Sequence, residues 1–179
     1  MRLFVAVDPS TEAVEHLRER LPSAEQKIRW TDPTQWHLTL TFCGEVDDRT
    51  AEQLSDRLAR AAARHNPMNL ALNGAGAFSR PARAHAFWVG LTGDTRALSK
   101  LADSTSAAAR RCGLTIETRR FRPHLTIARA SPPADLRDVV TALASYDGPE
   151  WTATELHLVR STLGAKTVHE RIGTWPLGR

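Results

Sequence analysis

Hydrophobic and polar residues alternate along several short stretches of the chain, as they do in β-strands with one buried face. Leu3, Val5 and Val7 alternate in this way near the start. The same pattern predicts strands over residues 36–43, 68–73, 85–91, 114–118, 124–129, 151–161 and 167–174. Prolines and glycines predict a loop over residues 22–33 and a turn-rich connection over residues 74–81.

Four other stretches repeat their hydrophobic residues at helical spacing. One follows Asp8-Pro9, a pair that suits an N-cap and a first helical position. We expect the second helix to begin at Asp47. The third and fourth helices are expected to cover about residues 95–112 and 133–145. This mixture of elements predicts an α+β fold with antiparallel sheets. No linker or low-complexity segment divides the chain, so we expect residues 1–179 to form a single domain.

One short pattern occurs twice, in two of the predicted strands. The copies are His37-Leu38-Thr39-Leu40 and His124-Leu125-Thr126-Ile127, and they lie 124 − 37 = 87 residues apart. Side chains alternate between the two faces of a strand, so each histidine shares a face with the threonine two residues later. The aliphatic residues point the other way, into the core. Each copy therefore presents one imidazole and one hydroxyl from a rigid strand.

Two histidines that face each other suit acid–base chemistry at a phosphorus atom. An unperturbed imidazole has a pKa near 6.5, so one can be neutral while the other is protonated. The neutral imidazole would accept a proton from an attacking water, and the protonated one would donate to the departing ribose oxygen. The hydroxyls of Thr39 and Thr126 would stabilise charge on the non-bridging phosphate oxygens. The sequence thus favours His37, His124, Thr39 and Thr126 as catalytic residues.

Other interpretations of these residues are weaker. A single His-x-Thr on a strand is usually a polar pair without a function, but two copies that match at four positions are hard to explain in that way. A zinc site would need a third ligand, and the sequence has no HExxH, no paired Cys/His spacing and no acidic cluster. We therefore predict neither a metal nor another cofactor. Five histidines lack a partner motif. His16 and His65 are expected to be solvated, His85 can face either way, and His157 and His169 lie in C-terminal strands where either can border a cleft.

Composition and charge narrow the class of protein without naming a substrate. The net charge is +4 and the pI is about 9.7, with arginine far more frequent than lysine, which suits a partner that carries phosphates. The two cysteines, Cys43 and Cys112, are too few for a disulfide framework. No hydrophobic run is long enough to span a membrane, and the first residues are more typical of a strand than of a signal peptide. We expect a cytoplasmic monomer.

Seven segments, spread over nearly the whole chain, carry a family resemblance. They are Arg2–Asp8, Trp36–Val46, Phe78–Pro81, Trp88–Gly90, Phe121–Arg129, Leu156–Ser161 and Trp175–Leu177. In these segments the sequence resembles the two-histidine (2H) phosphoesterases. Within that superfamily it is similar to the LigT-like RNA 2',3'-cyclic phosphodiesterases, formerly called 2'-5' RNA ligases.

The resemblance implies a bilobal fold in which two pseudo-symmetric antiparallel sheets, flanked by helices, face a central cleft. It also implies metal-independent hydrolysis of a terminal 2',3'-cyclic phosphate, on RNA or an oligonucleotide, to a 2'-phosphate. In the family's scheme His37 is the proton donor and His124 is the proton acceptor. Phe42 and Arg129 match the aromatic residue and the arginine that follow the two motifs. They are therefore candidates to bind the terminal base or the phosphate.

The chain departs from the family pattern at two positions. Cys43 stands where leucine is common, and His169 stands where an aromatic residue, often tyrosine, is usual. The second change would alter substrate preference if that aromatic residue helps to shape the cleft. Two alternatives to the main hypothesis stay open. One is activity on other 2'-5' or cyclic phosphodiesters, including RNA joining by the reverse reaction. The other is a non-catalytic module that binds RNA ends, although such a module would be expected to lose one of the four motif residues.

Overall fold

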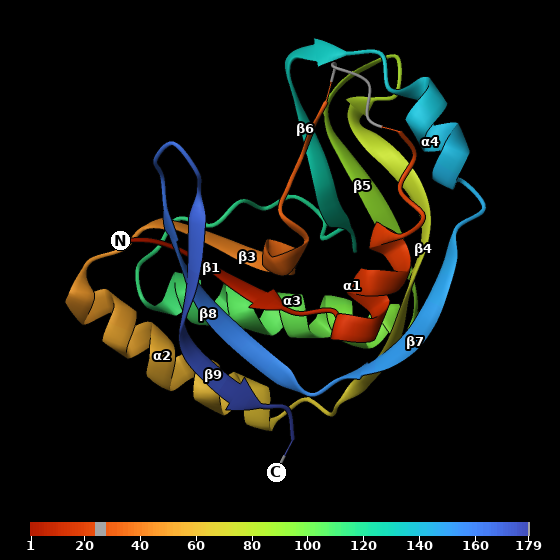
Figure 1. Cartoon of the computed structure of the whole chain (residues 1–179). Helices are drawn as coiled ribbons and strands as arrows, with labels where there is room; N and C mark the ends of the chain where they lie inside the picture. The colour runs from red at the N-terminus through yellow and green to blue at the C-terminus, as the bar shows by residue number, and fades with distance from the viewer. Residues whose placement is uncertain (24–27, 179) are drawn as a thin grey trace.

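The computed structural model describes residues 1–23 and 28–178 (Figure 1). Residues 24–27, within the loop predicted over 22–33, and residue 179 lie outside the described part. In chain order the elements are β1 (Arg2–Val7), α1 (Thr11–Arg18), β2 (Arg29–Trp30), the short 3-10 helix η1 (Pro33–Gln35), β3 (Leu38–Glu45), α2 (Asp48–Ala63), β4 (Met68–Arg80), β5 (Arg83–Gly93), α3 (Thr95–Arg111), β6 (Leu125–Ala134), α4 (Arg137–Leu143), β7 (Asp147–Ala153), β8 (Glu155–Thr162) and β9 (Val168–Pro176).

The strands form two antiparallel sheets. One has the order β3-β1-β8-β9 and the other has the order β2-β6-β5-β4-β7, which curves round from β6 to β7 in Figure 1. The strands β3 and β6 hold the same place in the two orders once the two-residue β2 is set aside. Each of these two strands begins at the residue directly after a motif histidine. The predicted α+β class, with two pseudo-symmetric antiparallel sheets, is confirmed.

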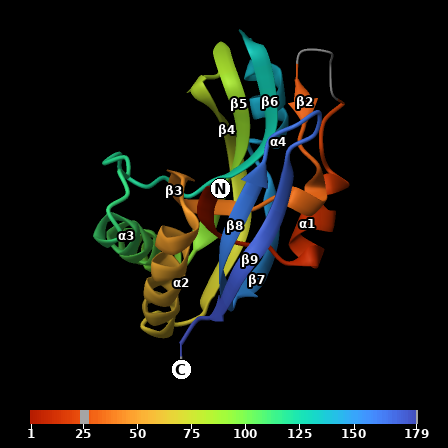
Figure 2. The same cartoon turned by 90° about the vertical axis from the view of Figure 1, so that its left-hand side faces the viewer.

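The helices cover outer faces of the sheets. Helices α2 and α3 pack against each other and under the first sheet, while α1 lies against β7 and α4 against β4 (Figures 1 and 2). Leu3 of β1 is buried in the same core as Leu54 of α2 and Leu98 of α3. Phe4 points to the opposite face and packs with Val159 of β8 in a small separate cluster. The first sheet thus has one face on the helices and one face free for a site. In the described residues, no helix has the length and apolar character needed to cross a membrane.

A β-bulge interrupts the alternation at the last residue of each copy of the motif. In β3 the register with β1 skips Leu40, and in β6 the register with β5 skips Ile127. Both of these residues are buried. Because side chains alternate between the two faces of a sheet, one extra residue moves each later side chain of the strand to the opposite face. Phe42 and Arg129 therefore return to the face of the motif threonines, whereas strict alternation predicts the opposite face for them.

The first bulge also turns Thr41 into the core. Its Oγ1 lies 2.8 Å from Thr105 Oγ1 and 2.9 Å from Ser106 Oγ, both on α3. Thr105 donates its own hydrogen to the carbonyl oxygen of Ala102 at 3.0 Å. The Thr41 hydroxyl must therefore donate to Thr105 and accept from Ser106. This chain of buried hydrogen bonds ties the motif strand β3 to α3.

The structure corrects the predicted start of α1. The helix begins at Thr11, and Ser10 is its N-cap instead of Asp8. Asp8 does not act as a cap because its carboxylate is engaged elsewhere. It forms an ion pair with Arg171 of β9 and lies 3.4 Å from Nε2 of His157 of β8.

The other helices agree better with the sequence pattern. Asp47 is the N-cap of α2, as predicted, and α3 covers the predicted range to within one residue. Helix α4 is shorter than the predicted 133–145, because Pro132-Pro133 belong to the end of β6. On the edge of β6 that faces β2, the described strand β2 pairs only with Ala128 and Arg129. Prolines, which lack a backbone donor, therefore cost no ladder bond there.

One turn prediction and two strand predictions also need correction. Residues 74–81 are mostly strand, because β4 and β5 continue as a long hairpin that turns only after Arg80. The ring of Trp88 on β5 occupies the space that a side chain at Gly76 would take. The strand predicted over 114–118 is irregular. The strand predicted over 151–161 divides at Thr154 into β7 and β8.

Valine substitutions at Thr41 and Thr105 test the link between β3 and α3. Each single change removes one hydroxyl and leaves its partner with fewer hydrogen bonds, so we expect it to lower the free energy of unfolding by about 1–3 kcal/mol. The loss of unfolding free energy in the double variant should be smaller than the sum of the two single losses, by about 0.5 kcal/mol or more. Urea denaturation measures all three, with the exposed Thr118→Val as a control. Additive losses would show that the two hydroxyls are not coupled.

Candidate active site

A cleft of about 730 Å³ lies between the two sheets. All six residues selected from the sequence line it: His37, Thr39, Phe42, His124, Thr126 and Arg129. The first three come from β3 and the residue before it, and the other three come from β6 and the residue before it. The expected central cleft, with one His-x-Thr motif from each sheet, is therefore present.

His37 is held by a hydrogen bond and by two neighbouring rings. Its Nδ1 lies 2.8 Å from the carbonyl oxygen of Gln35. The imidazole stacks on Phe4, with ring centroids 4.6 Å apart and an interplanar angle of 28°. The ring of His169 meets it edge-on at 5.2 Å. A carbonyl oxygen only accepts, so Nδ1 carries the hydrogen and Nε2 is the nitrogen left for a ligand.

His124 has a matching set of contacts in the other sheet. Its Nδ1 lies 2.6 Å from the carbonyl oxygen of Arg122, again two residues earlier. Its ring is perpendicular to Phe78 of β4, with centroids 5.1 Å apart, and lies 6.1 Å from Trp88 of β5. The local chain therefore fixes the same tautomer twice, with Nε2 available on each imidazole.

Burial is the main influence on the pKa of both imidazoles. It lowers the pKa of His37 and of His124 below the ordinary value, because a charged ring loses its hydration inside the protein. In each case the hydrogen bond to the backbone carbonyl opposes this shift, since it favours the protonated ring. Without a bound anion, both rings therefore tend towards the neutral form.

The charges around the two imidazoles differ. Near His37 the carboxylate of Asp8 raises the pKa, against the lowering effects of His169 and Arg171. The charges that act on His124 are those of two arginines, and both lower its pKa. Of the two candidate imidazoles, His37 is thus the one with a carboxylate nearby.

Thr39 and Thr126 have the positions that the alternating pattern predicts. Both are half-buried and line the cleft, while their neighbours Leu38 and Leu125 are buried in the core. Neither threonine hydroxyl is hydrogen-bonded to another residue in the described part of the chain. The two hydroxyls are therefore available to an anionic ligand between the imidazoles.

Cations line the outer part of the cleft. Arg29 and Arg129 are neighbours across β2 and β6, Arg2 comes from β1, and Lys166 comes from the loop between β8 and β9. None of the four forms an ion pair with a residue that the structure describes. Asp32 also lines the cleft, and its carboxylate acts on Lys166 without forming an ion pair. The remaining excess of positive charge favours a ligand that carries phosphates.

Phe42 offers an apolar surface at the same end of the cleft. It is 49% exposed, which is unusual for a phenylalanine. The guanidinium carbon of Arg2 lies 4.9 Å from the centroid of its ring. An exposed aromatic ring beside a cation suits the stacking of a base whose phosphate lies nearby.

Sequence reasoning missed several residues of the cleft. Phe4 could have been identified, because it alternates with Leu3 and so faces away from the core. Arg29 and Lys166 belong to no motif or family segment that would have selected them, and Arg2 begins a segment that carries the family resemblance without being singled out there. His169, noted as a departure from the family pattern, faces the cleft and contacts the ring of His37. Its Nδ1 is buried and has no hydrogen-bond partner in the described residues.

A polar cluster joins three strands beside the cleft. Arg171 Nε donates to Asp8 Oδ2 at 2.8 Å, and His157 Nε2 lies 3.4 Å from the same carboxylate. On its other side His157 Nδ1 lies 2.9 Å from Thr174 Oγ1. These contacts hold the end of β1 against β8 and β9, and they keep the Asp8 carboxylate near His37.

Three histidines lie outside the cleft, as expected. His16 Nδ1 and His65 Nε2 each lie 2.8 Å from a hydroxyl, those of Tyr146 and Ser104, so both are hydrogen-bonded rather than simply solvated. His85 is exposed on β5. Among residues 1–23 and 28–178, no group of three or more His, Cys, Asp or Glu side chains is placed to hold a metal ion.

The two antiparallel sheets, with one His-x-Thr motif from each at a shared cleft, define the class of two-histidine phosphoesterases. The profile of the 2'-5' RNA ligase superfamily matches residues 6–165, and the chain belongs to this superfamily. The family predicted from the repeated motif is thereby confirmed.

Curated relatives and solved structures agree with this assignment. The chain is 29% identical over 144 residues to the RNA 2',3'-cyclic phosphodiesterase of Aeropyrum pernix, covering 80% of this chain and 81% of that protein. It is 28% identical over 169 residues to the protein of the same name from Archaeoglobus fulgidus, covering 93% and 94%. The crystal structure of E. coli LigT in apo form matches with a TM-score of 0.78 and 28% identity, over 99% of this chain and 98% of that one. LigT has also been crystallised with 3'-AMP.

The pKa shifts lead to a prediction for the free protein. Because burial lowers the folded-state pKa of His37 and of His124, both should titrate below pH 6.5, and the stability linked to their neutral forms should be lost as pH falls through that folded pKa. Inorganic phosphate in the cleft should raise both values, since an anion favours the imidazolium form. NMR titration of the ring nitrogens measures this, with His37→Asn and His124→Asn for assignment. Titration at or above pH 6.5 without phosphate would contradict the dominance of burial.

Proposed function

We propose that the protein is an RNA 2',3'-cyclic phosphodiesterase that hydrolyses a terminal 2',3'-cyclic phosphate to a 2'-phosphate without a metal ion. One observation carries the proposal: two imidazoles line the same cleft, each with Nδ1 bonded to a backbone carbonyl and Nε2 left for a ligand. The activity in the names of the curated relatives supports it. So does the 3'-AMP complex of LigT, because that nucleotide carries its phosphate on the ribose ring.

The proposed reaction is a single in-line displacement at phosphorus. Neutral His124 accepts a proton from water as the water oxygen bonds to phosphorus. The bond between phosphorus and O3' breaks, and protonated His37 donates its proton to O3'. The products are a 2'-phosphate and a free 3'-hydroxyl, and a proton exchange with solvent restores the two imidazoles. Each positioned acid or base contributes about 10²- to 10⁴-fold to the rate.

The charges around the imidazoles support this division of roles. The donor must be protonated before the reaction, and Asp8 raises the pKa of His37 against the lowering effects of burial, His169 and Arg171. The acceptor must be neutral, and the arginines Arg122 and Arg129 lower the pKa of His124. A substrate phosphate would favour one imidazolium in the cleft, and His37 is the one of the two on which a carboxylate acts. This argument is independent of the family's scheme.

The other residues of the cleft bind and stabilise the substrate in this proposal. The Thr39 and Thr126 hydroxyls donate to the non-bridging oxygens, where negative charge increases in the transition state. Arg129 lies on the same face as Thr126 and neutralises part of that charge. Phe42 stacks on the terminal base, with Arg2 at its ring.

Partner, domain organisation and location belong to the same proposal. RNA and oligonucleotide ends with a 2',3'-cyclic phosphate are the substrates, and the chain acts as a single-domain monomer. We place it in the cytoplasm, where thiols stay reduced. Both cysteines are free, and burial raises the pKa of Cys43 to about 12, so this thiol is an unreactive core residue.

Alanine substitution of either imidazole tests the mechanism. His37→Ala and His124→Ala should each reduce kcat by at least ~10²-fold, since each removes one proton-transfer group. The exposed His85→Ala should keep full activity, and circular dichroism should show all three variants folded. The assay uses a short RNA that ends in a 2',3'-cyclic phosphate and identifies which oxygen keeps the phosphate.

Three further outcomes bear on the same proposal. The pH profile of kcat should be bell-shaped, because one imidazole must be charged and the other neutral. Activity should persist in EDTA. Full turnover by His124→Ala, or complete loss of wild-type turnover in EDTA, would contradict the two-histidine mechanism. A 3'-phosphate product would reverse the choice of leaving oxygen and leave the 2'-oxygen as the atom that His37 protonates.

Arg129→Gln should separate phosphate binding from proton transfer. Loss of a charge-assisted contact that strengthens in the transition state should lower kcat/KM by about 10-fold or more, with the alkaline and acidic limbs of the pH profile still present. Arg83→Gln, an exposed change on β5 outside the cleft, removes the same charge and is the matched control. Equal losses in the two variants would show a long-range effect of net charge instead of a contact.

A further inference from the structure

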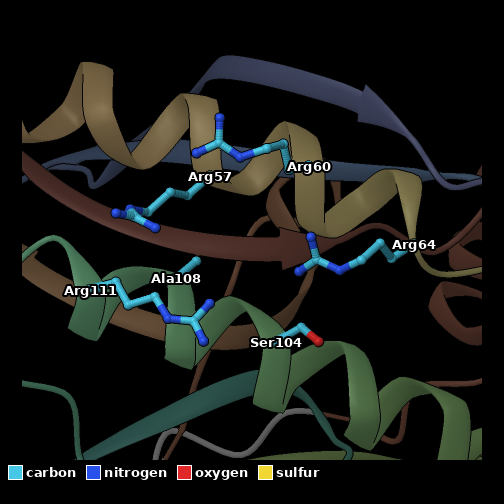
Figure 3. Close-up of a pocket in the computed structure, with 6 residues that line it drawn as sticks. All are labelled: Arg57, Arg60, Arg64, Ser104, Ala108 and Arg111. Carbon is cyan, nitrogen blue, oxygen red and sulfur yellow. The ribbon is translucent and has the colours of Figure 1, made fainter.

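A second group of arginines lies away from the cleft, between α2 and α3. Arg57 and Arg60 belong to α2, Arg64 follows its last residue, and Arg111 ends α3. With Ser104 and Ala108 they line a hollow of about 40 Å³, which we call the arginine groove. Figure 3 shows Arg57, Arg64 and Arg111 reaching into the space between the two helices.

The arginine groove and the cleft lie on opposite faces of the first sheet. Helices α2 and α3 cover the face that carries Leu3, whereas Phe4, on the other face, lines the cleft. The two sites share no lining residue. A ligand in the groove is therefore separate from a ligand at the imidazoles.

No side chain neutralises the arginine groove. None of its four guanidinium groups forms an ion pair or hydrogen bond with a residue in the described ranges, whereas Arg18, Arg137 and Arg171 all pair with carboxylates. Asp56 stands four residues before Arg60 on α2, at the spacing of helical ion pairs, yet the two do not pair. Four cations gathered without a counter-charge favour the binding of an anion.

Helix-end effects do not account for this gathering. A cation at the C-terminal end of a helix is stabilised by the helix dipole, which explains Arg64 and Arg111 separately. The two helices run in opposite directions across the groove, so Arg111 lies beside Arg57, about two turns before the end of α2. At the other end of the groove His65 Nε2 lies 2.8 Å from Ser104 Oγ and fixes the spacing of the two helices.

The chemistry of the groove points to phosphates on a chain. The guanidinium fork matches the geometry of phosphate oxygens and binds them in pairs. Arg57, Arg60 and Arg64 share one side of α2 and extend about 10 Å along it, at ~1.5 Å per residue. That length exceeds a single phosphate and suits neighbouring phosphates of one strand. The hollow itself has room for a small oxyanion.

We propose that the arginine groove binds the phosphate backbone of RNA, as a second site apart from the cleft. This inference goes beyond the proposed function, because it concerns binding and does not require turnover. The site recognises the charge and the spacing of the backbone phosphates, so it has no preference for a base sequence.

The salt dependence of RNA binding tests the proposal. The probe is a fluorescent single-stranded RNA of about 20 nucleotides with a 3'-hydroxyl end, measured by anisotropy over a range of KCl concentrations. The variant replaces Arg57, Arg60, Arg64 and Arg111 by glutamine. It should bind at least ~10-fold more weakly at low salt, and the slope of log K against log[salt] should fall by about 1.4 to 2.8, for two to four phosphate contacts at ~0.7 each.

A matched control removes the same charge elsewhere. It replaces four exposed cations outside both sites and outside α2 and α3 by glutamine: Arg20, Arg80, Arg83 and Arg119. The control should keep nearly the wild-type slope. An equal fall in both variants would overturn the proposal, because net charge alone would then explain it. Binding of inorganic phosphate in the groove, with unaltered RNA affinity, would also overturn it.

Turnover gives a readout that separates this site from the cleft. A mononucleotide 2',3'-cyclic phosphate fills only the cleft, so the groove variant should hydrolyse it with unchanged kcat/KM. If the wild-type protein lacks that activity but the groove variant still loses RNA affinity, the proposed function fails and the groove stands. Should the fourfold variant not fold in a thermal melt, Arg57→Gln/Arg111→Gln supplies the same test with a slope change of about 1.4.

Discussion

Strict alternation along β3 and β6 would carry Phe42 and Arg129 to the far side of the sheets, away from the imidazoles. The extra residue in each strand, Leu40 or Ile127, prevents this. Its side chain is buried, so the bulge is held in place by the core as well as by backbone pairing. The same constraint, repeated in the two sheets, brings three side chains of each motif strand to one cleft. The candidate site depends on these two irregularities, one in each motif strand.

The two sheets hold their imidazoles in the same way with different residues. In each case a carbonyl two residues earlier fixes the tautomer, and aromatic rings from neighbouring strands fix the plane of the ring. The surroundings then differ in charge, with a carboxylate as well as an arginine acting on His37 and arginines alone acting on His124. A symmetric frame with unequal electrostatics is what a donor and an acceptor require, because near-identical motifs alone cannot distinguish the two roles.

Features set by neighbouring residues could be predicted from the sequence, and those set by distant residues could not. The motif strands, α3 and the Asp47 cap of α2 follow from local patterns, and so does the shared face of each histidine and threonine. The predicted start of α1 was wrong because Asp8 forms an ion pair with Arg171, far along the chain, instead of capping the helix. The bulges were missed because they depend on register with another strand. Arg2, Arg29 and Lys166 reach the cleft only through the arrangement of the sheets.

Gly76 has a consequence for how such a protein can vary. The Trp88 ring occupies the place of a side chain at this position, and that ring lies next to both Phe78 and His124. Residue 76 never needs to touch a substrate, yet its size sets where the wall behind one imidazole stands. A larger residue at position 76 would force the Trp88 ring to move or to be replaced by a smaller side chain, so the choice of residue at either position constrains the other.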